Sequence, residues 1–132
     1  MMTNDVFKPH GYFSITVESD VLIVDSVGPF NIELVVKYRE ALEEKIAGFD
    51  GRQWRQIIVL REDSLFTPDA LEALKNAVKY RMSKGLIYSA IVIEHSEVKH
   101  LIEHQLASIY RSLDLPHSFY GALPEAKQAL NL

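Results

Sequence analysis

Cysteine is absent from the 132 residues of this chain. The chain therefore has no disulfide bond, thiolate metal site, cysteine-ligated iron–sulfur cluster or thiol nucleophile. A basic excess is missing too, since 18 acidic residues against 14 basic ones give a formal net charge of −4 at pH 7. Because little positive charge is available to neutralise a phosphate backbone, we expect no nucleic-acid partner.

Long apolar runs are also missing, and no stretch is long enough to cross a bilayer as a helix. Residues 1–10 read MMTNDVFKPH, which lacks the basic start and apolar run of a signal peptide. We therefore expect a flexible tail over residues 1–11 and a cytoplasmic location. The whole chain is 48% hydrophobic and 24% charged, which is enough apolar material for one core. We expect a single domain over residues 12–132.

The spacing of apolar residues predicts strands and helices in alternation. Residues 13–17 alternate apolar and polar side chains, and a second β-rich run at 21–27 completes a β-hairpin. The apolar runs at 57–60 and 87–93 are typical of strands covered on both faces. A short edge strand is expected over 117–123.

Four helices are expected between these strands. The second has the strongest start, since Thr67 offers a hydroxyl cap, Pro68 needs no amide donor and Asp69 suits the helix dipole. The expected helices run over residues 31–48, 67–85, from about 96 to 115, and from 124 onward. The order β-β-α-β-α-β-α-β-α predicts an α/β sandwich in which about four helices cover a mixed sheet of about five strands.

The chain resembles the STAS family over residues 12–132. The likeness is strongest to the SpoIIAA-like branch of stand-alone bacterial proteins, which is grouped with CRAL-TRIO-type lipid-binding folds. It is carried by the buried strand Ile57-Ile58-Val59-Leu60, by Phe66 leading into Thr67-Pro68-Asp69-Ala70-Leu71, by the run from Ile87 to Ile93 and by the closing segment from Phe119 to Leu130.

The resemblance directs attention to the start of the second predicted helix. Partner-switching STAS proteins carry an aspartate-serine-serine-glycine tetrad there, and its second serine is phosphorylated. In this chain Thr67-Pro68-Asp69-Ala70 looks like that tetrad, with neither serine present. A fixed carboxylate mimics phosphoserine only in part. Stabilisation of the helix start by Thr67 and Asp69 is the simpler explanation, and a partner contact is the alternative.

His100, Glu103 and His104 match H-x-x-E-H, the motif of inverted zinc peptidases. Two histidines one turn apart can bind zinc while the glutamate activates water. The same residues fall on the polar arc of an amphipathic helix, which predicts exposure to water. A metal-dependent hydrolase is therefore only an alternative. We expect no metal site and no catalytic residue.

Apolar residues also occur outside the predicted stripe of the first helix. Ile32 and Val36 lie away from that stripe and adjoin Phe30 just before the helix. Packing against the hairpin is the simpler explanation, because single apolar residues on a surface are common. A contiguous exposed patch would instead indicate a contact with a membrane, a ligand or a subunit.

The second predicted helix carries a basic flank made of Lys75, Lys79, Arg81 and Lys84, with Tyr80 opposite the apolar stripe. Such a flank is ordinarily a solvated helix face. Combined with an apolar patch, it would supply the electrostatic attraction and shallow insertion of peripheral membrane binding.

No nucleophile elbow, glycine-rich phosphate loop or dinucleotide fingerprint is present. We therefore expect a non-enzymatic module without a cofactor. It would bind an apolar or lipid-like ligand between sheet and helices, associate transiently with the inner membrane, and admit its ligand by lifting the terminal helix. The alternative is a regulatory protein contact like that of the anti-sigma antagonists. The residues expected to bind the ligand or the partner are Phe66, Thr67, Asp69 and Tyr80, and those expected in a membrane or apolar contact are Phe30, Ile32, Val36, Lys75 and Lys79. The sequence does not decide whether the protein forms a homodimer.

Overall fold

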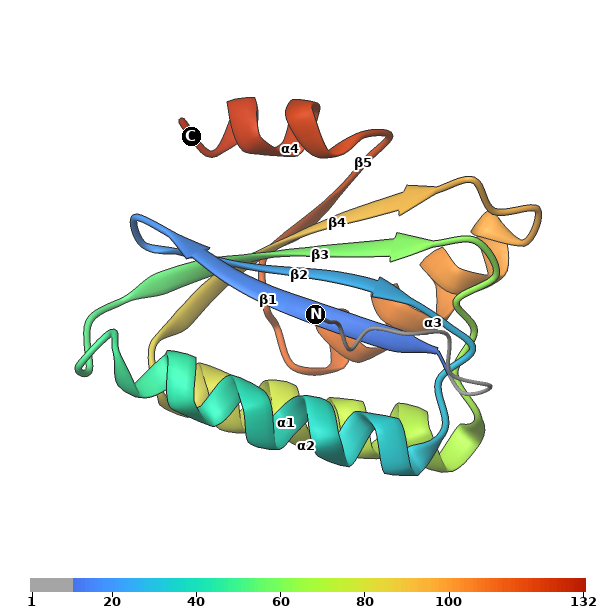
Figure 1. The fold of residues 1–132 in the computed structure, drawn as a ribbon, viewed down its shortest axis with the longest axis horizontal. Helices are drawn as coiled ribbons and strands as arrows, with labels where there is room; N and C mark the ends of the chain where they lie inside the picture. Colours follow the sequence, from blue (N-terminus) through green and yellow to red (C-terminus); the bar gives the residue numbers. More distant parts are fainter. Residues whose placement is uncertain (1–10) are drawn as a thin grey trace, which may run out of the picture.

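Five strands form one mixed sheet in the order β1-β2-β3-β4-β5 in the computed structural model, which describes residues 11–132 (Figure 1). The first ten residues of the predicted tail (1–11) lie outside the described residues. The strands are β1 Tyr12–Glu18, β2 Val21–Val27, β3 Trp54–Arg61, β4 Leu86–Glu94 and β5 His117–Tyr120. β1 pairs antiparallel with β2, and the remaining neighbours pair in parallel. The predicted β-hairpin and mixed sheet are confirmed.

Three helices cover one face of this sheet and a fourth covers the other (Figure 1). Their bounds are α1 Ile32–Ala47, α2 Pro68–Ser83, α3 Lys99–Ser112 and α4 Leu123–Ala129. From β2 to β5 each parallel step moves one strand in the same direction. Because such crossovers are nearly always right-handed, α1, α2 and α3 all come to lie on one side. The predicted element order β-β-α-β-α-β-α-β-α is confirmed.

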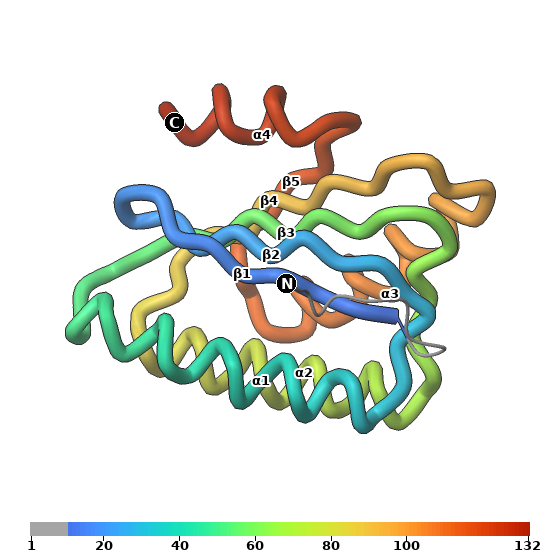
Figure 2. The backbone as a smooth tube through the Cα atoms, in the orientation of Figure 1, coloured from blue at the N-terminus to red at the C-terminus, as the bar shows by residue number. Residues whose placement is uncertain are grey.

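The two faces of the sheet therefore carry two separate cores. The larger core packs residues such as Leu22, Ile58 and Ile91 against α1, α2 and α3. The smaller core packs Ala126 and Leu130 at the end of the chain against the opposite face, as the separation of α4 from α1 and α2 in Figure 2 illustrates. The strict alternation of side chains along each strand decides which residue enters which core.

Local signals fix most helix ends where the sequence places them. The Asn31 side chain accepts a hydrogen bond from the Leu34 amide at 2.9 Å and caps the start of α1. The helix ends at Ala47, and Gly48 follows it as predicted. The third helix differs, because it begins at Lys99 and not near Ser96. The Ser96 hydroxyl instead donates to Asp63 and accepts from the Val98 amide, so it stabilises the loop. Within residues 11–132, no helix has both the length and the apolar character needed to cross a membrane.

Candidate functional site

A cavity lies in the larger core, between the sheet and helices α1, α2 and α3. Most of its wall is apolar: Phe13, Val24, Phe30, Leu34, Val35, Ile58, Leu60, Phe66, Leu74 and Leu106. The space between these side chains measures about 450 Å³ when its open side is included, whereas the centre of a water molecule has only about 30 Å³ to occupy. The walls therefore lie close together, and side chains must move apart before a sizeable ligand can enter.

Four polar residues complete the wall, and Arg81 is the most unusual of them. Its side chain is 2% exposed although it carries a positive charge. One terminal nitrogen, Nη1, donates to Gln56 Oε1 at 3.2 Å. The guanidinium carbon lies 4.9 Å from the centroid of the Tyr38 ring, within the range of a cation–π contact. The other terminal nitrogen, Nη2, makes no hydrogen bond to any residue in the described part of the chain.

No carboxylate among residues 11–132 forms an ion pair with Arg81. The ion pairs formed among residues 11–132 involve other cations. Burying a charge without a partner is costly, and a guanidinium group does not relieve that cost by losing a proton. Only neutral groups, an amide oxygen and an aromatic face, stabilise the cation here.

Gln56 connects Arg81 to a short buried chain of hydrogen bonds. Its Nε2 donates to Ser89 Oγ at 2.9 Å, and Ser89 Oγ donates in turn to the Tyr110 hydroxyl at 3.3 Å. Burial raises the pKa of Tyr110 to about 12, although the Ser89 hydrogen bond acts in the opposite direction. Burial also raises the pKa of Tyr38, and the nearby Arg81 charge partly offsets this. Both phenols consequently stay protonated near neutral pH and keep a proton to donate.

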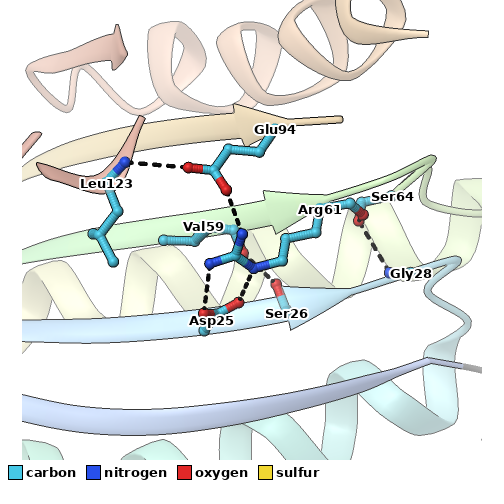
Figure 3. A network of polar contacts seen from close by, with 8 residues as sticks. All are labelled: Asp25, Ser26, Gly28, Val59, Arg61, Ser64, Glu94 and Leu123. Carbon is cyan, nitrogen blue, oxygen red and sulfur yellow. Dashed lines mark hydrogen bonds and ion pairs between the residues drawn. The ribbon is translucent and has the colours of Figure 1, made fainter. Parts of the chain in front are cut away.

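Ser26, the fourth polar wall residue, already has a partner. Its hydroxyl donates to the carbonyl oxygen of Val59 at 2.9 Å (Figure 3). Among the described polar groups of the wall, Arg81 Nη2 is thus the buried donor without a partner, while Tyr110 accepts from Ser89 and keeps its own proton.

A second polar cluster lies on the opposite face of the sheet, where Arg61 bridges two carboxylates (Figure 3). Its guanidinium donates to both oxygens of Asp25 at 2.8 and 3.0 Å and also to Glu94. Glu94 additionally accepts from the Leu123 amide at the start of α4, at 3.3 Å. This cluster joins β2, β3, β4 and α4 through ion pairs, and it differs in that respect from Arg81, whose charge has no carboxylate partner among the described residues.

The residues predicted to make a contact at the start of α2 have two different roles. Thr67 and Asp69 stabilise the helix start, and Phe66 lines the cavity. Thr67 Oγ1 accepts from the Ala70 amide at 3.3 Å and donates to Asp69 Oδ1 at 2.6 Å, which confirms the predicted cap. That hydrogen bond from Thr67 is the main reason that the pKa of Asp69 is lowered. Phe66 instead lines the cavity, where its ring centroid lies 4.7 Å from that of Phe30. Thr67 and Asp69 are exposed and do not belong to the cavity wall.

The predicted apolar patch on α1 is only partly on the surface. Phe30 is 5% exposed and lines the cavity, so the prediction that it belongs to an exposed patch is wrong. It is held there by backbone hydrogen bonds with Leu65 and Thr67, which draw it into the core beside Phe66. Ile32 is 38% exposed, and Val36 is half-buried. The role of these residues in membrane contact stays a prediction.

The predicted basic flank on α2 also separates into different environments. Arg81 is buried, so its placement on a solvated face is wrong. Lys75 is half-buried and lines a shallow groove against α3, whereas Lys79 is exposed. Tyr80 is 39% exposed, with Lys84 Nζ 5.7 Å from its ring centroid. A continuous basic stripe is therefore not present on this helix.

The H-x-x-E-H residues lie on the outside of α3. The His100 side chain is 99% exposed, and its Nδ1 lies 3.7 Å from Glu103 Oε1. Across the described residues, no group of three histidine or acidic side chains is placed to hold a metal ion. The motif match therefore has no third protein ligand beside it.

The terminal helix does not cover the cavity. Ala126 and Leu130 pack against Val21, Ile57 and Val92 on the opposite face of the sheet. Lifting α4 would expose that face and leave the cavity unchanged. The predicted entry by lifting of this helix therefore does not lead to this cavity.

Sequence reasoning missed Arg81, Gln56 and the two tyrosines as members of one site. A signal for Arg81 was nevertheless present, because it follows Val78 by three residues, Ala77 by four and Leu74 by seven. That spacing places it on the buried side of the helix. In comparisons with known proteins, no family model, no curated protein and no solved structure matched this chain. The interpretation of the cavity therefore depends on its own geometry.

Proposed function

We propose that this protein is a non-catalytic module that binds an apolar small molecule in the cavity between the sheet and helices α1, α2 and α3. The observation that carries the proposal is an apolar wall interrupted by a few convergent polar groups inside the core. Small-molecule sites typically have this composition, with volumes of roughly 300–1,000 Å³. The space here is about 450 Å³ only when its open side is counted, and little of it is accessible in the closed state, so the cavity must widen to reach that range.

The route into the cavity runs between β1 and α1 in this proposal. Phe13 of β1 and Tyr38 of α1 are half-buried members of the wall, and their rings meet edge to face at 5.4 Å. β1 is an edge strand paired on one side only, so a small movement of α1 away from it breaks no hydrogen bond of the sheet. Separation of these two rings would open the cavity and provide the room that it lacks when closed.

The proposed SpoIIAA-like membership within the STAS family agrees with this function. Its support is the element order, the mixed sheet and the segment Thr67-Pro68-Asp69-Ala70 at the start of α2. The grouping of that branch with lipid-binding folds is consistent with an apolar cavity. Fold likeness alone does not assign a function, so the cavity itself must be tested.

The direct test is binding of a neutral apolar probe. Purified full-length protein would be titrated with N-phenyl-1-naphthylamine, whose fluorescence increases in an apolar site, and examined by native mass spectrometry for co-purified lipid. We expect saturable binding at one site per chain. Absence of both saturable binding and co-purified lipid would overturn the proposal.

A matched pair of variants locates the site. Val24 lines the cavity, whereas its neighbour Ile23 faces α4 on the same strand. Val24→Phe fills the cavity and should abolish probe binding. Ile23→Phe overpacks the other core and should leave probe binding unchanged. Each change costs roughly 1–3 kcal/mol of stability, so folding is checked by circular dichroism. Equal effects of the two variants would contradict this location.

We further propose that the ligand is exchanged during brief contact with the inner membrane. Ile32 supports this, because it is an exposed apolar side chain close in sequence to the wall residue Phe30. Lys79 adds an exposed positive charge on α2. Co-sedimentation with phosphatidylglycerol vesicles at low salt should decrease for Ile32→Ser. No sedimentation of the native protein would overturn this part alone.

A further inference from the structure

We propose that the ligand of this cavity is an apolar monocarboxylate, such as a medium-chain fatty acid, and that Arg81 binds its carboxylate. The inference rests on the proposed function, because it names the ligand class of the same cavity. It follows from the charge that the cavity wall contains and from the groups that surround that charge.

The charge in the cavity wall belongs to Arg81. Its side chain is 2% exposed, it lines the cavity, and its Nη2 has no hydrogen-bond partner among residues 11–132. A buried guanidinium that keeps its charge is stabilised best by an anion held in charge-assisted hydrogen bonds. Since the described carboxylates do not approach Arg81, a ligand is the partner that would supply this anion.

Two tyrosines of the same wall offer further hydrogen-bond donors to a carboxylate. Tyr110 accepts a hydrogen bond from Ser89, so its own proton remains free to donate. Tyr38 lies against the guanidinium and belongs to the same wall. A carboxylate beside Nη2 would therefore meet one charged donor in a wall that also carries two protonated phenols. Gln56 holds the other end of the guanidinium fork at 3.2 Å, which restricts its orientation.

The single positive charge of the site favours a ligand with one negative charge over a ligand with two negative charges or none. Of the wall residues in the described part of the chain, Arg81 alone is charged, and the others are apolar apart from neutral hydroxyls. A phosphate monoester carries up to two charges and would leave one of them buried without a partner. A neutral molecule would leave the charge of Arg81 unbalanced. A single carboxylate on an apolar body matches both the charge and the wall.

The test compares dodecanoate with dodecanol, which have the same chain length and differ in the charged end. Each would compete against N-phenyl-1-naphthylamine bound to full-length protein, below the concentration at which dodecanoate forms micelles. We expect dodecanoate to bind more tightly than dodecanol by roughly tenfold or more, because hydrogen bonds to a charged group are involved. Arg81→Met should remove this preference, because the carboxylate loses its charged hydrogen-bond donor.

Lys79→Met provides the control, since it removes an exposed positive charge from the same helix without altering the cavity. It should keep the preference for dodecanoate. Equal affinities for the two compounds in the native protein would overturn the carboxylate inference while the apolar binding function stands, whether or not Arg81→Met folds. Loss of the preference in Lys79→Met as well would also overturn it, because general electrostatic attraction would then be the cause. Failure of both compounds and the probe to bind would instead overturn the proposed function.

Discussion

The guanidinium of Arg81 lies against the face of Tyr38, with 4.9 Å between its central carbon and the ring centroid. This contact joins α2 to α1 across the cavity and places a positive charge deep in an apolar core. A cation–π contact and a single amide hydrogen bond are modest compensation for burial of a charge. The core thus contains a cation without an anionic partner, at a cost in free energy that a bound anion would reduce.

The interaction between Arg81 and Gln56 should be measurable as a coupling energy. Gln56→Leu removes the one described acceptor of the guanidinium and should be more destabilising in the native background than in Arg81→Met. A double-mutant cycle measured by urea unfolding should give a coupling of roughly 1–3 kcal/mol. Additivity within about 0.5 kcal/mol would contradict the hydrogen bond.

The stability of the protein should decline in the alkaline range because of Tyr110. Its pKa is about 12 in the folded protein, against about 10 in an unfolded chain. Below the unfolded value both states are protonated, and stability does not depend on this group. As the pH rises from about 10 toward 12, the unfolded state loses its proton first, so the free energy of unfolding falls by roughly 2–3 kcal/mol.

Urea unfolding at a series of alkaline pH values measures this decline. Tyr110→Phe should show a shallower dependence on pH than the native protein. Some dependence should persist, because the pKa of Tyr38 is also raised by burial. Identical slopes for the two proteins would contradict the assignment to Tyr110.

The fold was predictable because its signals are local. Asn31 and Thr67 begin helices in the structure as their side chains predict, and Gly85, with a φ of +110°, follows the end of α2. The start of α3 was not predictable in the same way. Ser96 looks like a cap in the sequence, but its hydroxyl is used by Asp63, which is 33 residues away. A contact at that separation leaves no periodic pattern in the sequence.

The candidate site was predictable only in fragments. Phe66 was selected at the start of α2, but its partner Phe30 was placed on the surface and Arg81 on a solvated face. Charged residues are rarely buried, and that general tendency outweighed the helical spacing of Arg81 relative to Leu74 and Val78. The cavity itself depends on how three helices and a sheet fit together, which no single segment specifies.

The cap at the start of α2 should contribute to stability independently of the cavity. Thr67→Ala should lower the free energy of unfolding by up to about 1 kcal/mol, because the Ala70 amide loses one of its two acceptors and keeps Asp69 Oδ1 at 2.9 Å. It should also raise the pKa of Asp69 toward its ordinary value, since the Thr67 hydroxyl is the main group that lowers it. An NMR titration of the Asp69 carboxyl group measures the second effect. Thr67→Ser keeps the hydroxyl and should resemble the native protein, so a shift in that variant would contradict the explanation.

The position of α4 predicts that the stability of its packing and the binding of a ligand are independent. Leu130 is 5% exposed and packs on the face of the sheet opposite the cavity, whereas Leu74 lines the cavity. Leu130→Ala and Leu74→Ala each remove a buried side chain and should each cost roughly 2–5 kcal/mol in urea unfolding. Under conditions where both variants stay folded, only Leu74→Ala should change the affinity for N-phenyl-1-naphthylamine. A change of similar size in Leu130→Ala would mean that α4 controls access after all, and the route between β1 and α1 would have to be abandoned.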